Sequence, residues 1–575
     1  MKIHLTIIAI FVYLFSFGQA YPVFLDGSFD EWPNSTNTFA DEAGDGNSID
    51  LLNLKILNDQ SYLYIYLKMY EVINLNTDNT LVLLLDTDND AATGFQKNGI
   101  GAELKWNFSR RKGTFYYSGT ETSVWHSDIG FVGLPTVSGP EFEMAINRNT
   151  TINGYPLFQA NQIKTVVYAD ETSGDMIPEP GSTFSYTFDE SATQAFEEIN
   201  LSKTDEGFLR LMTYNTLYDG IADAGKQESF KRIIQAVNPD VLTLNECWDT
   251  EASYIKTLLN QWLPINGGQW YASKIADGNI TASRYPITNN YNVLSGQRLA
   301  ASYIDLPNSF ASDLVVVNCH LKCCNEASDN VTRQYEADGL ISFIMKMKNQ
   351  IPNFEVATNT PFVFMGDFNL VGGRQQLHTL INGDIQNTSV FGIGGFPDWN
   401  NQPMGNVVST GTNNRMAYTW RDDSGSYWPG RLDYIFYTQS SLKKEKSFIL
   451  ETAKISTEFL NAYNLQASDA QTASDHFTHV ADFSVHEYNT IHRSIANQLT
   501  VYPNPAQDYL RIDLPENEKI HNLQIFDASG KCLFTLIPTE ALNHRTINTN
   551  QWKAGVYLIR VMSNKNNYIQ KVLIE

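Results

Sequence analysis

Short apolar runs alternate with helix-period stretches between Phe208 and Val485, and this alternation constrains the fold more than any other feature of the sequence. Chains in which strands and helices alternate belong to the α/β or α+β class, with helices packed on the faces of sheets. The predicted strands are Leu209–Tyr214, Val241–Leu244, Leu314–Asn318, Phe362–Met365 and Tyr434–Tyr437, and the predicted helices are Ser229–Val237, Arg333–Lys348 and the region after Glu251.

The stretches on either side of this region lack helix-period segments and are predicted to be all-β. Tyr62–Leu67 alternates as a half-buried strand does, Leu81–Leu85 fits a fully buried strand, and Gly555–Val561 alternates cleanly near the other end. A chain of 575 residues is also too long for one core. We therefore predict a β-sandwich at 21–195, an α/β domain at 205–487 and a small β-sandwich at 498–575, with a polar linker over Glu190–Thr204.

The first twenty residues have the pattern of a secretory signal peptide. Lys2 precedes an apolar run from Leu5 to Phe15, and Gly18-Gln19-Ala20 places small residues at the spacing that a signal peptidase recognises. The run is too short to anchor the chain in a bilayer, and no later stretch approaches the roughly eighteen apolar residues of a membrane helix. We expect residues 1–20 to be removed on export, leaving a chain without a transmembrane anchor.

The negative charge of the chain is unevenly distributed. The formal charge is −23, of which residues 21–200 hold −17 and residues 208–487 hold −8. Because phosphate contacts normally supply most of the affinity for nucleic acids, the total argues against a purely electrostatic nucleic-acid binder. A local basic groove in the central domain is still compatible with the milder value there.

Four of the five cysteines lie in the central domain, at Cys247, Cys319, Cys323 and Cys324. An oxidising destination favours a disulfide among them, with the partners left open. A metal cluster is the alternative, but the paired CxxC units of a typical zinc site are missing from the sequence.

Polar or acidic groups follow apolar strands at five places in the central domain, and an Asp-His pair precedes a sixth β-like stretch. Strand ends are rigid platforms, which a site needs when small displacements cost large factors in rate. We expect these six segments to converge at one edge of a sheet sandwich. They are Thr213–Asn215, Thr243–Glu246, Val317–His320, Phe364–Asn369, Arg431–Tyr434 and Ala473–His476.

Three of the side chains suit a divalent cation. Asn215, Glu246 and Asp475 offer the hard oxygen ligands that Mg²⁺ prefers, and Mn²⁺ and Ca²⁺ are alternatives. Such a cation is a common partner in phosphoryl chemistry, where charge builds up on the phosphate oxygens.

The remaining side chains suit the hydrolysis of a phosphodiester. Asp367 can serve as the base for a water molecule, with Asn369 positioning the scissile phosphate. His320 and His476 can donate hydrogen bonds to the phosphate or the leaving group, and a carboxylate such as Asp433 would fix a ring's tautomer and raise its basicity.

These residues and their order resemble the endonuclease/exonuclease/phosphatase superfamily, which includes DNase I-like nucleases, abasic-site endonucleases, sphingomyelinases and inositol phosphate phosphatases. The resemblance covers about 208–487 and implies a four-layered DNase I-like α/β sandwich. It implies that Asn215 and Glu246 lie at the metal and that Asp433 pairs with His476. The motifs that carry it are Asn318–Leu321 (NCHL), Gly366–Asn369 (GDFN), Arg431–Ile435 (RLDYI), Ser474–His476 (SDH) and the more structural Ser283–Ile287 (SRYPI).

The N-terminal region carries clustered carboxylates at alternating positions, Asp86, Asp88 and Asp90. They suggest a Ca²⁺ site, although the spacing is not that of an EF-hand and an acidic hairpin turn is the alternative. With Asp26–Trp32, this pattern resembles family-nine carbohydrate-binding modules and related sugar-binding β-sandwiches. The resemblance implies a glycan partner, on which aromatics such as Trp106 and Trp125 would stack, but core packing explains them equally well.

The last segment resembles the type A sorting domain of the type IX secretion system. Tyr502–Pro505 (YPNP), the middle stretch Leu523–Lys531 and Gly555–Val561 (GVYLIRV) match it. The resemblance implies the type IX machinery as a partner, export through the periplasm, and a secreted or cell-surface destination.

The sequence thus predicts a secreted, metal-dependent phosphoric ester hydrolase, with an extracellular nuclease as the leading hypothesis. One alternative is a phospholipid or small-molecule phosphodiesterase or phosphatase of the sphingomyelinase kind. For that alternative, Phe391–Trp399 is a candidate membrane-contacting loop. The other alternative is a non-catalytic surface adhesin.

Overall fold

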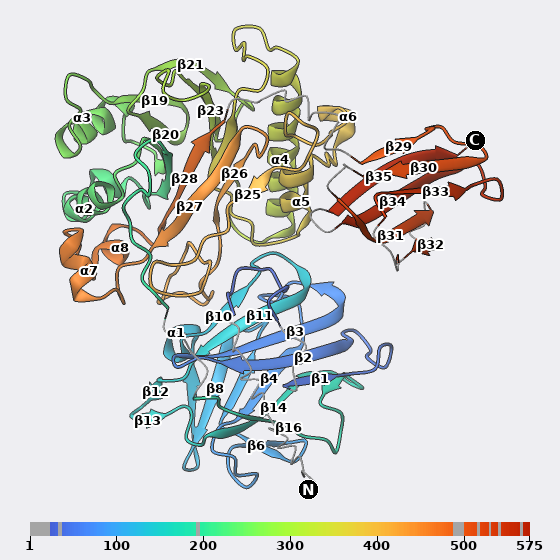
Figure 1. Ribbon diagram of the computed structural model, residues 1–575. Coiled ribbons are helices and arrows are strands. Elements are labelled where there is room, and N and C mark those ends of the chain that lie inside the picture. The colour runs from blue at the N-terminus through green and yellow to red at the C-terminus, as the bar shows by residue number, and fades with distance from the viewer. Residues whose placement is uncertain are drawn as a thin grey trace, which may run out of the picture. The chain divides into compact units, whose positions relative to one another are not determined.

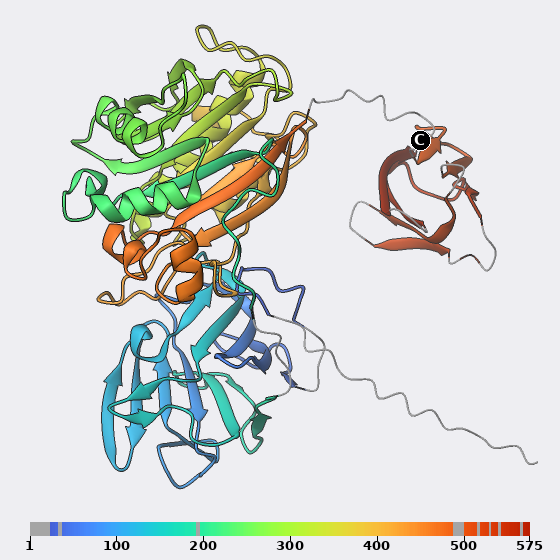
Figure 2. The same cartoon turned by 60° about the vertical axis from the view of Figure 1, so that its left-hand side comes forward.

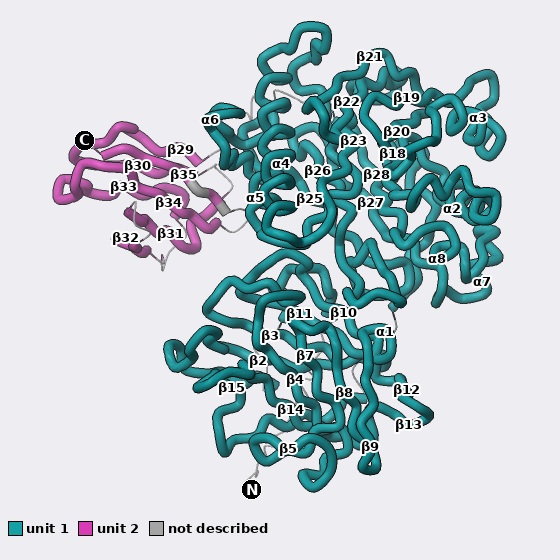
Figure 3. Tube along the Cα trace, turned by 180° about the vertical axis from the view of Figure 1, so that it is seen from behind, with its two compact units in different colours: residues 1–486 teal, residues 487–575 magenta. Residues whose placement is uncertain are grey.

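The computed structural model describes residues 23–32, 37–190, 196–486, 499–514, 518–527, 531–536, 538, 542–563 and 567–574. The signal peptide expected at 1–20 lies outside these residues. The chain forms two compact units, residues 1–486 and residues 487–575 (Figure 3). The predicted fold class is confirmed: a central four-layered α/β domain is accompanied by two β-rich domains.

Residues 37–190 form a two-sheet β-sandwich, drawn in blue to cyan in Figure 1. Alternation along β3 (Tyr62–Ile73) explains its packing, because Leu63, Ile65 and Leu67 are buried between the two sheets. One sheet has the order β1 (Thr38–Ala40), β2 (Leu51–Asn58), β3, β11 (Gly139–Asn147), β10 (Val132–Leu134). The other has the order β15 (Met176–Ile177), β14 (Gln162–Ala169), β4 (Leu81–Asp86), β7 (Leu104–Asn107), β8 (Lys112–Tyr117), β9 (Thr120–Val124), with β16 (Phe184–Thr187) also beside β14. The smaller elements are β5 (Phe95–Lys97), β6 (Ile100–Ala102), α1 (His126–Ile129), β12 (Thr151–Ile152) and β13 (Tyr155–Pro156).

Two six-stranded sheets pack face to face in the central domain (Figure 2). Their inner faces meet in a core that joins Leu211 and Val241 of one sheet to Val316, Val363 and Ile435 of the other. The first sheet has the order β19 (Tyr271–Ala276), β20 (Gly278–Ser283), β18 (Val241–Cys247), β17 (Leu209–Asn215), β28 (Thr478–Val485), β27 (Leu442–Leu450). The second has the order β21 (Ile287–Asn292), β22 (Leu299–Ile304), β23 (Leu314–His320), β24 (Phe362–Asp367), β26 (Asp433–Tyr437), β25 (Gly405–Asn406).

Helices cover the outer face of each sheet and complete the four layers. Ile233 of α2 and Leu259 of α3 pack on the first sheet, and Leu340 of α4 and Leu380 of α5 pack on the second. The predicted helices are confirmed, but α4 begins earlier than expected because the Asp329 carboxylate accepts a hydrogen bond from the Glu326 backbone and caps the helix. The helices are η1 (Gly220–Ala222), α2 (Gln227–Val237), α3 (Ala252–Trp262), α4 (Ala327–Lys348), α5 (Gln375–Asn382), α6 (Thr388–Phe391), α7 (Thr457–Ala462) and α8 (Asp469–Ala473).

The sandwich and the central domain share buried side chains. Trp428 of the central domain lies in the sandwich core, with its ring centroid 5.0 Å from that of Phe131, and its indole N–H donates to the Gly133 carbonyl (3.1 Å). On the other face of β3, Tyr64 and Tyr66 join a second buried cluster with central-domain residues. Both faces of this strand are therefore buried, one inside the sandwich and one against the central domain.

The C-terminal unit is a small β-sandwich of its own. Leu510, Ile525 and Ile559 lie in the core between its two sheets. The sheets have the orders β29 (Thr500–Tyr502), β30 (Tyr509–Asp513), β33 (His544–Asn548), and β32 (Cys532–Leu536), β31 (Ile520–Asp527), β34 (Gly555–Ser563), β35 (Asn567–Ile574). Among the described residues of the whole chain, helices that combine the length and the apolar character needed to span a bilayer are not found.

Candidate active site

Strand register brings three of the predicted residues side by side in the second central sheet. The parallel pair β23 and β24 places His320 opposite Asp367, and the antiparallel pair β24 and β26 places Asp367 opposite Asp433. In the first sheet, Asn215 lies opposite Asn245 in the parallel pair β17 and β18. Because paired residues project to the same face of a sheet, the polar ends of these strands meet at one edge of the sandwich.

Backbone irregularities aim two segments into this edge. The pairing of β18 with β20 shifts register between Leu244 and Cys247, and Glu246 inside this bulge has a left-handed φ of 58°. Bulges of this kind redirect a side chain at functional sites. Gly366 has φ 148°, and a Cβ there would lie 1.8 Å from the Cys319 carbonyl oxygen, so no other residue fits before Asp367.

The Asp367 carboxylate is the hub of the site. Its Oδ2 accepts hydrogen bonds from Asn215 Nδ2 (3.1 Å) and Asn369 Nδ2 (3.0 Å). The Nε2 atoms of His320 and His476 lie 3.7 Å and 3.8 Å from the same oxygen, beyond hydrogen-bond distance. Four nitrogens from four segments thus surround one buried oxygen, and two of them still have hydrogen-bonding capacity.

A carboxylate fixes the orientation of one imidazole. His476 Nδ1 donates to Asp433 Oδ2 (2.8 Å), and Asp433 is held in turn because Thr419 Oγ1 accepts from the backbone N–H of Leu432 and of Asp433. Burial alone would lower the pKa of His476, but the carboxylates of Asp433 and Asp367 outweigh it and raise that pKa to about 10. His476 is therefore a cation at neutral pH.

The second imidazole has the opposite character. His320 is buried, and its Nδ1 has no hydrogen-bond partner among the described residues. Burial lowers the pKa of His320 well below its ordinary value, and Arg298 and His476 lower it further, so the ring is neutral. Its centroid lies 5.8 Å from that of Trp248. The site therefore pairs one charged with one neutral histidine.

The donor set fits a divalent cation. Glu246, His320 and Asp367 each offer a ligand atom within 4.8 Å of the others. A second group, Asp367, Asp433 and His476, has the same spacing, but its cationic imidazole does not ligate a metal. Asn215 Nδ2 also donates to Glu246 Oε1 (3.0 Å). Burial raises the pKa of Asp367 to about 7 against the opposing effect of His476, and a bound cation would offset this cost to its charged form.

The structure brings seven of the eight predicted site residues into direct contact or ligand distance of one another. Asp475 lies beside these residues, because Ser474 Oγ donates to the Asn215 carbonyl (2.8 Å). The Asp475 carboxylate, however, belongs to neither of the two ligand groups and accepts a hydrogen bond from Trp420 Nε1 (2.9 Å). The seven are Asn215, Glu246, His320, Asp367, Asn369, Asp433 and His476.

A buried amide network beneath the site was not predicted from the sequence. Asn245 Nδ2 donates to Asn279 Oδ1 (3.0 Å) and Asn318 Oδ1 (2.8 Å), and Asn245 Oδ1 accepts from the Asp367 backbone N–H (3.0 Å). Asn245 and Asn318 lie in the segments already singled out for Glu246 and His320. A polar residue in a central apolar strand was the signal that could have identified them.

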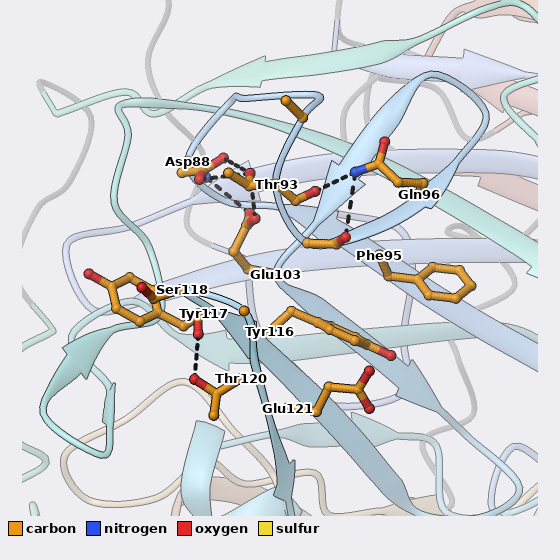
Figure 4. A pocket seen from close by; sticks show the side chains of 13 residues that line it. Asp88, Thr93, Phe95, Gln96, Glu103, Tyr116, Tyr117, Ser118, Thr120 and Glu121 are labelled. Atoms are coloured by element: carbon orange, nitrogen blue, oxygen red, sulfur yellow. Dashed lines mark hydrogen bonds between the residues drawn. The ribbon is translucent and has the colours of Figure 1, made fainter.

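A second acidic group lies in the sandwich, beside an open cavity of about 800 Å³ (Figure 4). Asp86, Asp88 and Glu103 each offer an oxygen within 4.8 Å of the others, so Glu103 from beside β7 takes the place expected of Asp90. The Asp90 carboxylate instead accepts from the backbone N–H of Ala92 (3.0 Å). Both oxygens of the fully buried Asp86 lack a hydrogen bond in the described structure, although Lys164 Nζ lies 3.6 Å away.

The aromatic and sulfur groups differ in exposure. Trp106 is fully buried in the sandwich core, whereas Trp125 is 39% exposed. All cysteines in the described structure are free, with Cys247 and Cys319 buried. The sulfur atoms of Cys323 and Cys324 lie 2.9 Å apart in an exposed turn.

Comparisons with known proteins agree with this architecture. A model of the endonuclease/exonuclease/phosphatase family matches residues 212–476, and a model of the secretion system C-terminal sorting domain matches residues 500–575. No curated protein matches the chain.

The chain is similar to several solved structures. An endonuclease/exonuclease/phosphatase from Beutenbergia cavernae DSM 12333 is 14% identical over 64% of this chain and 100% of its own, with a TM-score of 0.32. Beta toxin 275–280 from Staphylococcus aureus is 17% identical over 48% of this chain and 99% of its own, with a TM-score of 0.29. The human Nocturnin catalytic domain is 18% identical over 49% of this chain and 95% of its own, with a TM-score of 0.29. At these values the similarities carry no argument about function.

The seven residues grouped above are named here the carboxylate–histidine cluster. The family match spans all the strand ends that carry them, from β17 to the Asp-His pair before β28. The match at the other end covers the separate C-terminal unit, and such a domain marks a chain for export to the cell surface or the medium. The central domain therefore belongs to the endonuclease/exonuclease/phosphatase superfamily, and residues 500–575 form a type IX secretion C-terminal sorting domain.

Proposed function

We propose that the protein is a metal-dependent phosphodiester hydrolase that acts outside the cell, with nucleic acid as its leading substrate. The observation that carries this proposal is the Asp367 hub, where a carboxylate oxygen lies between two amides and two unsatisfied imidazole nitrogens. Family members hydrolyse phosphoric esters, and the residue types at this hub match the needs of that reaction: a base, an orienting amide and donors for phosphate oxygens.

The cation would be held at Glu246, with Asn215 beside it and Asp475 as the further ligand predicted from the sequence. Hard oxygen ligands favour Mg²⁺, with Mn²⁺ and Ca²⁺ as alternatives. When bound, such a cation supplies Lewis-acid stabilisation of the charge that develops on phosphate oxygens.

The protein's own groups divide the remaining work. Asp367 accepts the proton of the attacking water, and its pKa of about 7 suits a base at neutral pH. Asn369 fixes this carboxylate and orients the phosphate. The cationic His476, held by Asp433, donates from Nε2 to a phosphate or leaving-group oxygen. Neutral His320 contributes a second donor near Asp367 Oδ2.

A phospholipid substrate is the second candidate, because apolar side chains are exposed in one loop. Val390 is 58% exposed, Ile393 89% and Phe396 45%, which puts them within or next to the loop predicted as a membrane contact. Exposed apolar groups of this kind are used at membrane surfaces, whereas a nuclease gains nothing from them.

In the sandwich, we propose Ca²⁺ at Asp86, Asp88 and Glu103, and a glycan in the adjoining cavity, where Tyr116 and Tyr117 offer aromatic surface (Figure 4). Binding of glycans to the chain with and without Ca²⁺ tests this, and a Glu103→Gln variant should lose the Ca²⁺ dependence. Glycan binding by the unsubstituted chain that is equally strong in Ca²⁺ and in EDTA would argue against a cation at this group.

The catalytic proposal is tested with bis(4-nitrophenyl) phosphate, first in EDTA and then with Mg²⁺, Mn²⁺ or Ca²⁺ restored. Metal-restored hydrolysis is expected, and Asp367→Ala or His476→Ala should lower turnover more than a hundredfold without unfolding the protein. Failure of any metal to restore hydrolysis would favour the adhesin alternative. Duplex DNA, RNA and sphingomyelin vesicles supplied to the same preparation then separate the substrate classes.

A further inference from the structure

Five carboxylates meet at one edge of the sandwich, away from the group that contains Asp86. Asp41, Asp45 and Glu179 each offer an oxygen within 4.8 Å of the others, and Asp45 does the same with Asp50 and Asp175. Asp45 belongs to both sets, so the five form one continuous cluster, named here the edge cluster. Its members come from two segments more than a hundred residues apart, 41–50 and 175–179.

Protein cations do not balance this charge. Within the described parts of the chain, no lysine, arginine or histidine forms an ion pair with any member of the edge cluster. In the described structure the donors that reach it are backbone amides: Glu42 N–H donates to Asp41 Oδ1 (3.2 Å), Gly44 N–H to Asp50 Oδ2 (2.8 Å), and Leu51 and Met176 N–H to the two oxygens of Asp175 (2.5 Å each).

Two buried oxygens of the cluster lack any partner in the described structure. Asp50 is only 5% exposed, yet its Oδ1 accepts no hydrogen bond, and the same holds for Oδ2 of Asp41. A buried carboxylate oxygen is normally satisfied, because leaving it without water and without a donor is costly. These oxygens are therefore free to accept a donor or a cation that is not part of the protein.

The spacing of the oxygens matches a shared ion. Two ligands bound to one Ca²⁺ at 2.3–2.6 Å can be at most about 5 Å apart, and the ligand atoms of each set lie within 4.8 Å of one another. Ca²⁺ takes six to eight oxygen ligands, including bidentate carboxylates, whereas Mg²⁺ keeps a smaller octahedral shell with several waters. A group of five carboxylates in segments outside helices and strands suits the larger ion.

We propose that the edge cluster is a Ca²⁺ site, with Asp45, Asp50 and Asp175 as its inner ligands and Asp41 and Glu179 completing it. Asp50 directly precedes β2 of the five-stranded sheet, and Asp175 directly precedes β15 of the seven-stranded sheet. A bound ion therefore links the edges of the two sheets, so that the sandwich is strengthened by Ca²⁺ independently of catalysis and of the Asp86 group.

The test uses the whole chain, stripped with EDTA and then titrated with Ca²⁺. To isolate the edge cluster, an Asp88→Asn background removes a ligand of the other sandwich group, and bound Ca²⁺ is counted by equilibrium dialysis. Asp45→Asn should lower the count by one ion per chain and abolish most of the Ca²⁺-induced rise in Tm, a rise expected to be on the order of 4 °C at a hundred times Kd. Asp50→Asn should behave alike, and the exposed Asp78→Asn is the matched control that changes neither quantity.

The melting temperature gives the sharper readout, because the difference in Tm between Asp45→Asn and its parent should change sign between EDTA and Ca²⁺. Without Ca²⁺, Asp45→Asn should melt at the same temperature as its parent or higher, since it removes one of five like charges. With Ca²⁺ it should melt lower than its parent. An unchanged ion count in both Asp45→Asn and Asp50→Asn would overturn the proposal. The proposal would also be overturned if the parent melted at the same temperature in Ca²⁺ and in EDTA and became more stable as pH falls. In that case shared protons, and not Ca²⁺, would balance the charge of the edge cluster.

Discussion

Trp428→Ala is expected to damage catalysis from inside the sandwich, although residue 428 does not contact any member of the carboxylate–histidine cluster. Its indole is 3% exposed, lies against Phe131 and Trp106 (ring centroids 5.0 Å and 6.5 Å away), and donates to the Gly133 carbonyl. Removing a buried tryptophan costs about 3–5 kcal/mol in unfolding free energy, and the unpaired carbonyl adds about 1 kcal/mol.

The link to catalysis runs through the segment that ends in Trp428. Gly430 and Trp420 exchange backbone hydrogen bonds (3.0 Å and 3.1 Å), Trp420 Nε1 donates to the Asp475 carboxylate, and Thr419 accepts from the backbone of Asp433. If the Trp428 side chain no longer fills the sandwich core, this segment is fixed only at its end beside Trp420. A displacement of about 1 Å in a catalytic group can cost roughly a hundredfold in rate, so kcat should fall ten- to a hundredfold while KM changes little.

The assay is steady-state hydrolysis of bis(4-nitrophenyl) phosphate at a temperature where circular dichroism shows the variant folded. Trp270→Ala is the matched control, since Trp270 is equally buried, in the outer core of the first central sheet, and its N–H also donates to a backbone carbonyl. It should lose similar stability and keep kcat. Equal kcat in the two variants would refute the idea that the sandwich positions the site, and Trp428→Phe should restore most of the rate.

Three further outcomes are expected. In a profile of kcat/KM against pH, the rate should rise as Asp367 loses its proton near pH 7 and fall as His476 loses its proton near pH 10. Asp433→Asn should move the fall at high pH several pH units lower. The charge of His476 should stabilise the fold fully below its unfolded pKa of about 6.5, and that contribution is lost as pH rises through about 10. Asp433→Asn should therefore lower the free energy of unfolding most below about pH 6.5, and progressively less as pH rises toward 10. Gly366→Ala should abolish soluble, folded protein or lower its Tm sharply, because the added methyl would overlap the Cys319 carbonyl; a normal Tm would show that β24 can shift.

Much of the central domain could be predicted because its strands are apolar runs interrupted by single polar residues. The sequence order of Glu246, His320, Asp367 and His476 then indicated which strand ends would meet, and the register of β23, β24 and β26 confirms that His320 and Asp367 are neighbours. Four of the five predicted strands ended one or more residues early, and the fifth, Tyr434–Tyr437, began one residue late, since a polar side chain at the end of a strand still takes part in the backbone ladder.

Contacts that depend on distant segments could not be predicted. Glu103 replaces Asp90 in the acidic group because β7 returns beside the Asp86 turn, a pairing that alternation within one segment does not reveal. Trp428 lies in a loop rich in glycine, serine and aspartate, which predicts exposure, and it is buried only because the sandwich core accepts it. The edge cluster joins residues 41–50 to residues 175–179 through the same kind of long-range packing.

The amide network of Asn245, Asn279 and Asn318 has a consequence for re-engineering this enzyme. Buried apolar side chains can be exchanged for others of similar volume, whereas these amides hydrogen-bond specific partners across the two sheets. A shift of one sheet by one residue would leave several of these donors without an acceptor. Their hydrogen bonds fix the position of the two central sheets relative to each other. Variant libraries that aim at new substrate specificity should therefore change the loops around the active site and keep Asn245, Asn279 and Asn318.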